Sequence, residues 1–322
     1  MSAAPPVPAT DGPRGVMLLT FGSAVTSADV PAYLRSVRGG REPSADLVAE
    51  FERRFDVIGR SPLIEITSAQ ADALERLLAG LHGDGAFRVS AGMLHSAPWI
   101  PDSLRGLVEA GVTSVIAIVL APQYSPLILS GYQRALDAAA GEVAPGVPLR
   151  IAGAWHLLPS WVSSLADRVD EALRRFDAAG RDRLAVVFTA HSLPRSVVER
   201  DPGYMVQIDE TIEAVADRVG LAPGQWSFAF QSAGHTPEEW LKPDLTEVLS
   251  TMGNAGSTDV LVVPVQFVSD HLEILYDIDV AAAGQASAAG LGFHRIAMPN
   301  ADPRFIAALA EVVDREMAAA PV

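Results

Sequence analysis

The 322-residue sequence contains no cysteine. This absence excludes disulfide bonds, iron–sulfur clusters and cysteine nucleophiles, so any metal chemistry must use histidine, carboxylate or tyrosine ligands. Positive charge is also scarce: 24 lysines and arginines stand against 39 aspartates and glutamates, a formal net charge of −15. A surface of that sign repels nucleic acids and anionic membranes, and neither is expected as a partner.

Long apolar runs are missing as well. The densest run, residues 115–121, is far shorter than the roughly 20 residues that a membrane-spanning helix needs, so no transmembrane segment is predicted. Residues 1–13 are rich in alanine and proline and are predicted to form a disordered tail. This tail has no basic region followed by an apolar stretch, so it is not predicted to be a signal peptide, and we expect a cytoplasmic protein.

Short β-branched runs alternate with amphipathic segments along the whole chain. This alternation predicts an α/β fold with parallel sheets that are covered by helices on both faces. The expected strands are residues 16–21, 87–91, 114–121, 184–189, 226–230 and 259–265. The helix-like segments include residues 44–57, 67–81, 161–177, 207–219 and 243–252.

The two halves of the chain resemble each other. Residues 15–23 resemble residues 184–192, and residues 111–120 resemble residues 256–265. This similarity predicts two doubly wound, Rossmann-like domains that place equivalent strand ends on opposite sides of an interdomain cleft, where such folds bind ligands.

The predicted domain boundary lies where proline and glycine cluster, near residues 141–154. We predict an N-terminal domain of residues 14–145 and a C-terminal domain of residues 146–322 that ends in a helix.

His191 directly follows a continuous apolar strand. The carboxyl end of a parallel strand is the functional edge of an open sheet, which makes His191 a candidate ligand or base. A histidine that merely hydrogen-bonds a loop backbone is the structural alternative.

Glu273 has two interpretations. If Asp270 is the N-cap of the following helix, Glu273 occupies the third helical position and completes a capping box worth about 1 kcal/mol. However, Asp277 follows at i+4, and like charges at that spacing are unfavourable unless a cation lies between them. Fe²⁺ accepts imidazole nitrogen and carboxylate oxygen, so a metal site formed by His191 and Glu273 is the other interpretation.

Two further segments are candidates for ligand contacts. Residues 122–132 read as a loop in which the aliphatic residues 127–129 either fill the core or form an apolar lip for a large flat ligand. Six arginines fall within residues 35–60; most are expected on solvated helix faces, and two or three could bind carboxylates through bidentate contacts.

A series of motifs resembles a known family in the same order along the chain. They are residues 20–23, 58–67, 191–194, 230–232, 237–244 and 264–273. On these motifs the sequence resembles the ferrochelatases over roughly residues 14–318. Residues 38–43, 92–99, 120–122 and 298–300 resemble the coproporphyrin-type members most.

The resemblance implies a chelatase-type pair of Rossmann-like domains with a porphyrin in the cleft between them. It implies that Fe²⁺ is a substrate, and that His191 and Glu273 form the metal site and the catalytic pair. Asp277 matches the acidic path for the metal, but Ala281 stands where the next acid of that path would be.

The resemblance also implies a set of porphyrin contacts. The candidate residues are Phe21, Arg38, Arg54, Ser61, Tyr124 and Tyr132. Phe21 stands where some members carry a tyrosine that ligates the product iron. In the mechanism that we hypothesise, the cleft buckles the macrocycle, and either His191 or Glu273 accepts a pyrrole proton while the other binds iron.

The implied reaction is insertion of Fe²⁺ into coproporphyrin III to give Fe-coproporphyrin III (coproheme). Three alternatives stay open: a protoporphyrin IX ferrochelatase, a non-catalytic porphyrin or haem carrier, and a small-molecule binding protein of periplasmic type. An iron donor and a downstream haem-pathway enzyme are possible partners.

Overall fold

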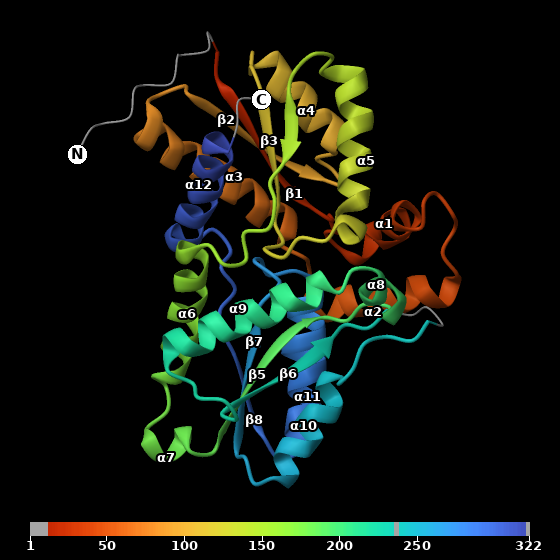
Figure 1. Ribbon diagram of the computed structural model, residues 1–322. Helices are drawn as coiled ribbons and strands as arrows, with labels where there is room; N and C mark the ends of the chain where they lie inside the picture. Colours follow the sequence, from red (N-terminus) through yellow and green to blue (C-terminus); the bar gives the residue numbers. More distant parts are fainter. Residues whose placement is uncertain (1–11, 235–237, 320–322) are drawn as a thin grey trace, which may run out of the picture.

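The computed structural model describes residues 12–234 and 238–319 and contains two four-stranded parallel sheets (Figure 1). The first sheet has the order β2-β1-β3-β4 and the second the order β6-β5-β7-β8. The strands are β1 (Arg14–Thr20), β2 (Phe87–Met93), β3 (Val115–Val119), β4 (Leu149–Ile151), β5 (Leu184–His191), β6 (Trp226–Gln231), β7 (Asp259–Pro264) and β8 (Gly292–Arg295).

The second sheet repeats the strand order of the first. β1 and β5 hold the same place in the two orders, and so do β3 and β7. The similarity between residues 15–23 and 184–192, and between residues 111–120 and 256–265, therefore reflects equivalent strands. The prediction of two similar α/β units with parallel sheets is confirmed.

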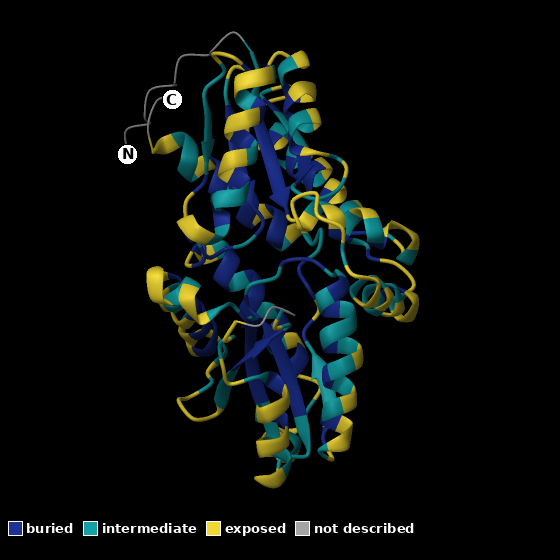
Figure 2. Cartoon of the chain, turned by 90° about the vertical axis from the view of Figure 1, so that its right-hand side faces the viewer, coloured by how far each residue is buried: buried dark blue, intermediate teal, exposed yellow. Residues whose placement is uncertain are grey.

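Helices connect the strands and cover the sheets. In the first half they are η1 (Ser27–Asp29), α1 (Val30–Val37), α2 (Ala45–Ile58), α3 (Leu63–His82), α4 (Ile100–Glu109) and α5 (Pro126–Val143). In the second half they are α6 (Pro159–Leu173), α7 (Ala178–Arg181), α8 (Arg195–Arg200), α9 (Gly203–Val219), α10 (Leu245–Asn254), the π-helix η2 (Glu273–Ala282), α11 (Ala283–Ala288) and α12 (Pro303–Ala318). Buried strands lie inside, and exposed residues gather on the outer faces of the helices (Figure 2).

The sequence analysis missed two strands and misread one segment. β4 and β8 have three and four residues, too few for a clear hydrophobic pattern. Residues 122–132 are not a loop throughout, because α5 begins at Pro126. Proline is favoured at the first helical position, and the Ser125 hydroxyl accepts a hydrogen bond from the Ile128 amide at 3.3 Å.

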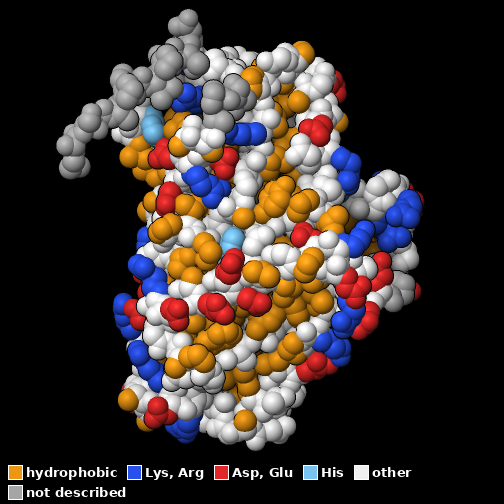
Figure 3. All heavy atoms as spheres, in the orientation of Figure 1, with side chains coloured by type: hydrophobic (Ala, Val, Ile, Leu, Met, Phe, Trp, Pro, Cys, Tyr) orange, Lys and Arg blue, Asp and Glu red, His pale blue; other side chains and the backbone are white. Residues whose placement is uncertain are grey.

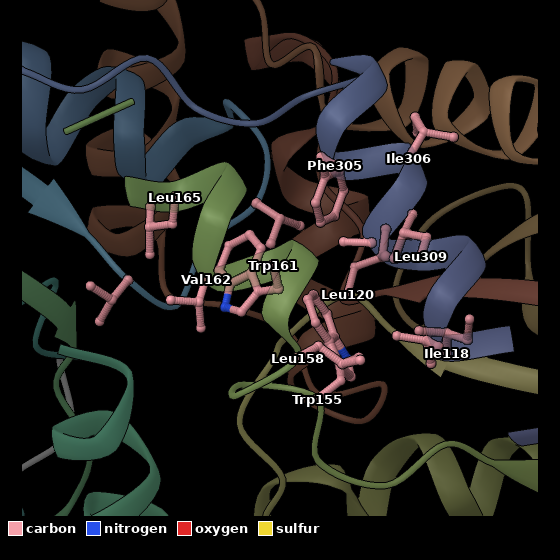
Figure 4. Packing of buried hydrophobic residues seen from close by; sticks show 14 of the residues in the cluster. Ile118, Leu120, Trp155, Leu158, Trp161, Val162, Leu165, Phe305, Ile306 and Leu309 are labelled. Atoms are coloured by element: carbon pink, nitrogen blue, oxygen red, sulfur yellow. The ribbon is translucent and has the colours of Figure 1, made fainter. Parts of the chain in front are cut away.

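One hydrophobic cluster joins the two sheets. It includes Val16 and Ile118 of the first sheet, Phe188 of the second, and residues of α3, α6, α9 and α12. Trp161 of α6 and Phe305 of α12 form its centre, with ring centroids 5.8 Å apart (Figure 4). The two halves therefore share a core and are held in one relative position.

The chain crosses between the halves twice. β4 pairs with β3 in the first sheet, and α12 returns from the second half to pack against α3 and α6. The division at residue 145 stays a prediction. Of the predicted tail, residues 1–11 lie outside the described part, and the Pro13 carbonyl accepts a hydrogen bond from the Thr113 amide at 2.8 Å. Among the described helices, none has the length and apolar character needed to cross a membrane.

Candidate functional site

A cleft of about 720 Å³ lies between the two halves. The ends of β1 and β3 contribute to one wall, and the ends of β5 and β6 contribute to the other. This is where parallel α/β sheets place their ligands. The lining side chains used below are Phe21, Arg54, Tyr132, His191, Glu273 and Asp277.

His191 is the last residue of β5, so the sheet fixes its backbone. Its amide donates a hydrogen bond to Gln266 Oε1 at 2.9 Å. Its ring Nδ1 contacts the Ser192 carbonyl, and because a carbonyl can only accept, Nδ1 carries a hydrogen. In the neutral ring the lone pair is therefore on Nε2, which lies 3.6 Å from Glu273 Oε2.

Glu273 is the first residue of the π-helix η2. Its Oε2 is buried and accepts no hydrogen bond from the part of the chain that the structure describes, with His191 Nε2 at 3.6 Å and His271 Nε2 at 3.8 Å. Burial raises the pKa of Glu273, but the charges of His191, His271 and Arg54 outweigh burial and lower that pKa to about 2. The side chain is thus a carboxylate with one buried oxygen that makes no hydrogen bond within the described residues.

The capping-box interpretation of Glu273 is wrong. The Asp270 amide donates to Asn300 Oδ1 at 2.8 Å instead of to Glu273. The Asp270 carboxylate accepts from Asn300 Nδ2 at 2.7 Å, and Leu272 precedes the π-helix. Glu273 is therefore free of a capping role.

Asp277 lies on the same side of the π-helix as Glu273, and both line the cleft. Burial raises the pKa of Asp277; the Ser232 hydroxyl, which donates to Oδ2 at 2.5 Å, opposes that rise, and the Glu273 charge adds to it. Arg54 Nη1 lies 3.3 Å from Asp277 Oδ1. The cation that the i+4 spacing requires is thus supplied in part by the protein itself.

Three of the six predicted porphyrin contacts line the cleft: Phe21, Arg54 and Tyr132. Phe21 is 44% exposed, and its ring stands edge-on to His95 with centroids 4.4 Å apart. Arg54 also pairs with Glu50 at 2.9 Å.

The other three predicted contacts are absent from the described lining of the cleft. Arg38 is exposed at the end of α1, and Ser61 is buried just before α3. Tyr124 lines a separate cavity of about 240 Å³ beside α5.

The aliphatic residues 127–129 divide among three environments because they lie on a helix. Ile128 lines the cleft, Leu129 is buried in the core, and Leu127 is 38% exposed. The single apolar lip that the sequence suggested is therefore reduced to one residue.

The arginine-rich window forms mainly ion pairs. Arg35 pairs with Glu42 at 2.6 Å, Arg53 with Glu50 at 2.9 Å, and Arg60 with Glu65 at 2.5 Å. Basic and acidic side chains mix on the protruding part that carries α1 and α2 (Figure 3). Of this group Arg54 alone lines the cleft.

Sequence reasoning missed several lining residues. Tyr33 and Trp240 add aromatic surface, and His271 stands beside Glu273. His271 belongs to the residues 264–273 motif and was detectable there. Tyr33 lies on a helix with no distinguishing pattern and was not.

Solved structures define the class of this fold. SirB from Bacillus subtilis with Fe³⁺ superimposes with a TM-score of 0.57 at 15% identity, covering 95% of this chain and 96% of SirB. The sirohydrochlorin chelatase SirB of Bacillus subtilis subspecies spizizenii, in complex with cobalt, gives 0.54 at 12% identity, covering 94% of each chain. The chain thus has the two-domain fold of the chelatases.

Sequence comparison gives the family. The ferrochelatase family model matches residues 13–317. A ferrochelatase of Deinococcus radiodurans is 38% identical over 307 residues (95% of this chain, 96% of the relative), and a coproporphyrin III ferrochelatase of Geobacillus sp. is 33% identical over 301 residues (93% and 96%). The chain belongs to the ferrochelatase family, lyases of haem biosynthesis that insert iron into a porphyrin. The predicted family and enzyme class are confirmed.

Proposed function

We propose that this protein inserts Fe²⁺ into coproporphyrin III and releases Fe-coproporphyrin III. The observation that carries the proposal is the unpartnered carboxylate oxygen of Glu273, which lies 3.6 Å from His191 Nε2 in the lining of a 720 Å³ cleft. This distance is too long for a hydrogen bond. The Glu273 oxygen therefore keeps its lone pairs for a cation.

The two side chains suit different parts of the reaction. With a pKa of about 2, Glu273 stays ionised at neutral pH, so it attracts a cation and is a weak base. His191 has its Nε2 lone pair directed at the cleft, because Nδ1 donates to the Ser192 carbonyl. We assign metal attraction to Glu273. We assign acceptance of one pyrrole proton to His191 in its neutral form; the second proton can follow only after His191 has passed the first to water.

Asp277 and Arg54 lie next on the route along the π-helix. Asp277 stands one helical turn beyond Glu273, so a cation that leaves Asp277 meets Glu273 next. Within the described residues, no group of three or more histidines and carboxylates is arranged to hold a metal ion. A resident metal ion in a protein usually has three or four protein ligands. The small number of ligands here therefore favours an ion that is transferred to the porphyrin.

The choice of coproporphyrin III rests on similarity and on the sequence segments that resemble that subgroup. Relatives from Geobacillus sp. and Anoxybacillus flavithermus that are named coproporphyrin III ferrochelatases are each 33% identical to this chain. Protoporphyrin IX remains the second candidate, because the 38% identical relative is named ferrochelatase without a stated porphyrin. Phe21, Arg54 and Tyr132 are the proposed porphyrin contacts.

The deciding experiment is anaerobic Fe²⁺ insertion, followed by absorbance, with coproporphyrin III and protoporphyrin IX in parallel. We expect faster insertion into coproporphyrin III. The reverse preference would make the protein a protoporphyrin IX enzyme. Tight binding of both porphyrins without metal insertion would instead support the carrier and remove the catalytic roles from His191 and Glu273.

A further inference from the structure

A dense polar cluster outside the cleft surrounds Arg295, the last residue of β8. Arg295 Nε donates to Asp279 Oδ1 at 2.7 Å, and Nη2 donates to Asp279 Oδ2 at 2.8 Å. Nη2 also reaches Asp270 Oδ1 at 3.3 Å. A planar guanidinium that contacts both oxygens of one carboxylate fixes the orientation of that carboxylate as well as its distance.

The two acidic partners of Arg295 bracket Glu273 in the sequence. Asp270 precedes the π-helix, and Asp279 lies within it. Arg295 therefore ties the loop before the helix to the helix itself, and its own side chain is only 14% exposed.

The Asp270 end of this connection is anchored in the other half of the molecule. Asp270 is held by Asn300 through two hydrogen bonds, of 2.8 and 2.7 Å. Gln70 of α3 is fully buried and donates to the Asn300 carbonyl at 2.9 Å. The loop that carries Asp270 is thus fixed relative to the opposite wall of the cleft.

The contact between Arg295 and Asp279 depends on the register of the helix η2. A π-helix has more residues per turn than an α-helix, is rare, and needs specific support. Over the six residues from Glu273 to Asp279, a change to α-helical register rotates Asp279 about the helix axis by a substantial part of a turn. Asp279 can then no longer meet Arg295 while Glu273 and Asp277 both face the cleft.

We propose that Arg295 is a positioning residue that holds η2 in its π-helical register and so directs Glu273 and Asp277 into the cleft. The inference rests on the proposed function for its consequence in metal insertion. Arg295 itself does not line the cleft, so it acts through Asp270 and Asp279.

The test compares Arg295→Met and the conservative Arg295→Lys with wild type, using Fe²⁺ and coproporphyrin III. Loss of a side chain that orients metal-binding groups typically costs about 10- to 100-fold in metal affinity or activity. We expect KM for Fe²⁺ to rise by that order in Arg295→Met and less in Arg295→Lys, with KM for the porphyrin nearly unchanged. Asp279→Asn should reproduce Arg295→Met, and Asp279→Glu should retain part of the function.

Arg304→Met is the matched control, because Arg304 makes a comparable two-point contact with Asp302 away from the π-helix. It should lose stability without a change in KM for Fe²⁺. Hydrogen exchange of the amides of residues 273–282 gives a second measurement that needs no substrate. Exchange there should accelerate in Arg295→Met and Arg295→Lys, but not in Arg304→Met.

Folded Arg295 variants with wild-type KM for Fe²⁺ and wild-type exchange in η2 would overturn the proposal. If wild type inserts no metal into either porphyrin, the proposed function fails by itself. The register role is then judged by exchange alone: selective acceleration in the Arg295 variants supports it, and equal exchange overturns it.

Discussion

Glu273 shows how one side chain acquires its role from its neighbours. Its Oε2 is buried, accepts no hydrogen bond from the described residues, and lies near two imidazoles. A buried polar atom without a partner is unfavourable, and proteins keep such an atom mainly where a ligand or an ion completes it. The unpartnered oxygen therefore favours a functional role for Glu273.

We predict that Glu273→Gln still folds, with lower stability than wild type at pH 7, and loses most iron insertion. Glutamine has the same shape and lacks the charge that attracts Fe²⁺. The loss in initial rate should be about 10²-fold or more, because even a group that only supports a metal ligand typically costs 10- to 100-fold in metal affinity or activity when it is removed. Thermal unfolding should be compared under the same conditions, and an active Glu273→Gln enzyme would contradict the metal-site assignment.

The pKa of Glu273 also predicts a pH dependence of stability. Because the folded pKa lies below the ordinary value of about 4.3, ionised Glu273 stabilises the fold fully above that value, and the contribution is lost as pH falls toward 2. Below about pH 4, the unfolding free energy of wild type should therefore fall relative to that of Glu273→Gln. If the difference in unfolding free energy between the two proteins stayed constant from pH 7 to pH 3, the lowered pKa of Glu273 would be contradicted.

At the scale of elements, a carboxylate at the N-terminus of α12 ties this helix to α6. Asp302 caps this helix by accepting from the Arg304 amide at 2.8 Å, and it also pairs with the buried Arg168 of α6 at 3.2 Å. The Arg304 guanidinium, the Arg304 amide and the charge of Arg168 lower the pKa of Asp302 to about 2, although burial opposes them. One carboxylate thus supports both a helix cap and a helix–helix contact.

We predict that Asp302→Asn destabilises the protein at pH 7 by about 1 kcal/mol, because solvent around the partly exposed carboxylate screens much of the value of its lowered pKa. Asparagine caps helices as well as aspartate does, so the loss reports the charge. The deficit should begin to shrink below about pH 4, where Asp302 of the unfolded chain starts to take up a proton, and should disappear near pH 2, where the folded carboxyl does so as well. Urea unfolding at pH 7, 5, 4 and 3 measures the loss in unfolding free energy. Asp302→Ala, which also removes the helix cap, should be less stable than Asp302→Asn at every pH.

At the scale of the whole molecule, the core cluster determines cooperativity. Phe305 is fully buried and packs against both Trp155 and Trp161 (Figure 4). The same cluster includes residues of both sheets. Because the two halves share this packing, they should unfold together.

Phe305→Ala should cost about 3–5 kcal/mol, as expected for a buried phenylalanine. Native-state hydrogen exchange should show equal loss of protection in β1 and β5, although Phe305 lies late in the chain. A loss confined to one sheet would mean that the halves unfold separately. Val57→Ala, at a position that is 52% exposed, should change neither sheet measurably.

Much of the fold was predictable because a buried parallel strand appears in the sequence as a run of consecutive apolar residues. The apolar runs that became β1, β3, β5 and β7 were recognisable, and so was their repetition in the two halves. β4 and β8 were not, because a strand of three or four residues at a sheet edge has too few positions to show a period. The start of α5 was missed because its apolar residues face the cleft, the core and solvent in turn.

The sequence by itself determined the chemistry that is possible here: without cysteine, a metal can meet only histidine, carboxylate or tyrosine, and His191 and Glu273 stand in family motifs. Only the tertiary structure decided which candidates act together. It places His191 Nε2 and Glu273 Oε2 3.6 Å apart. The Asp270 amide donates to Asn300 instead of forming a capping box with Glu273. Absent from the described cleft lining are Arg38, Ser61 and Tyr124. The physical reason is that residue types and local spacing are properties of neighbouring positions, whereas a site between two sheets depends on packing across residues far apart in the chain.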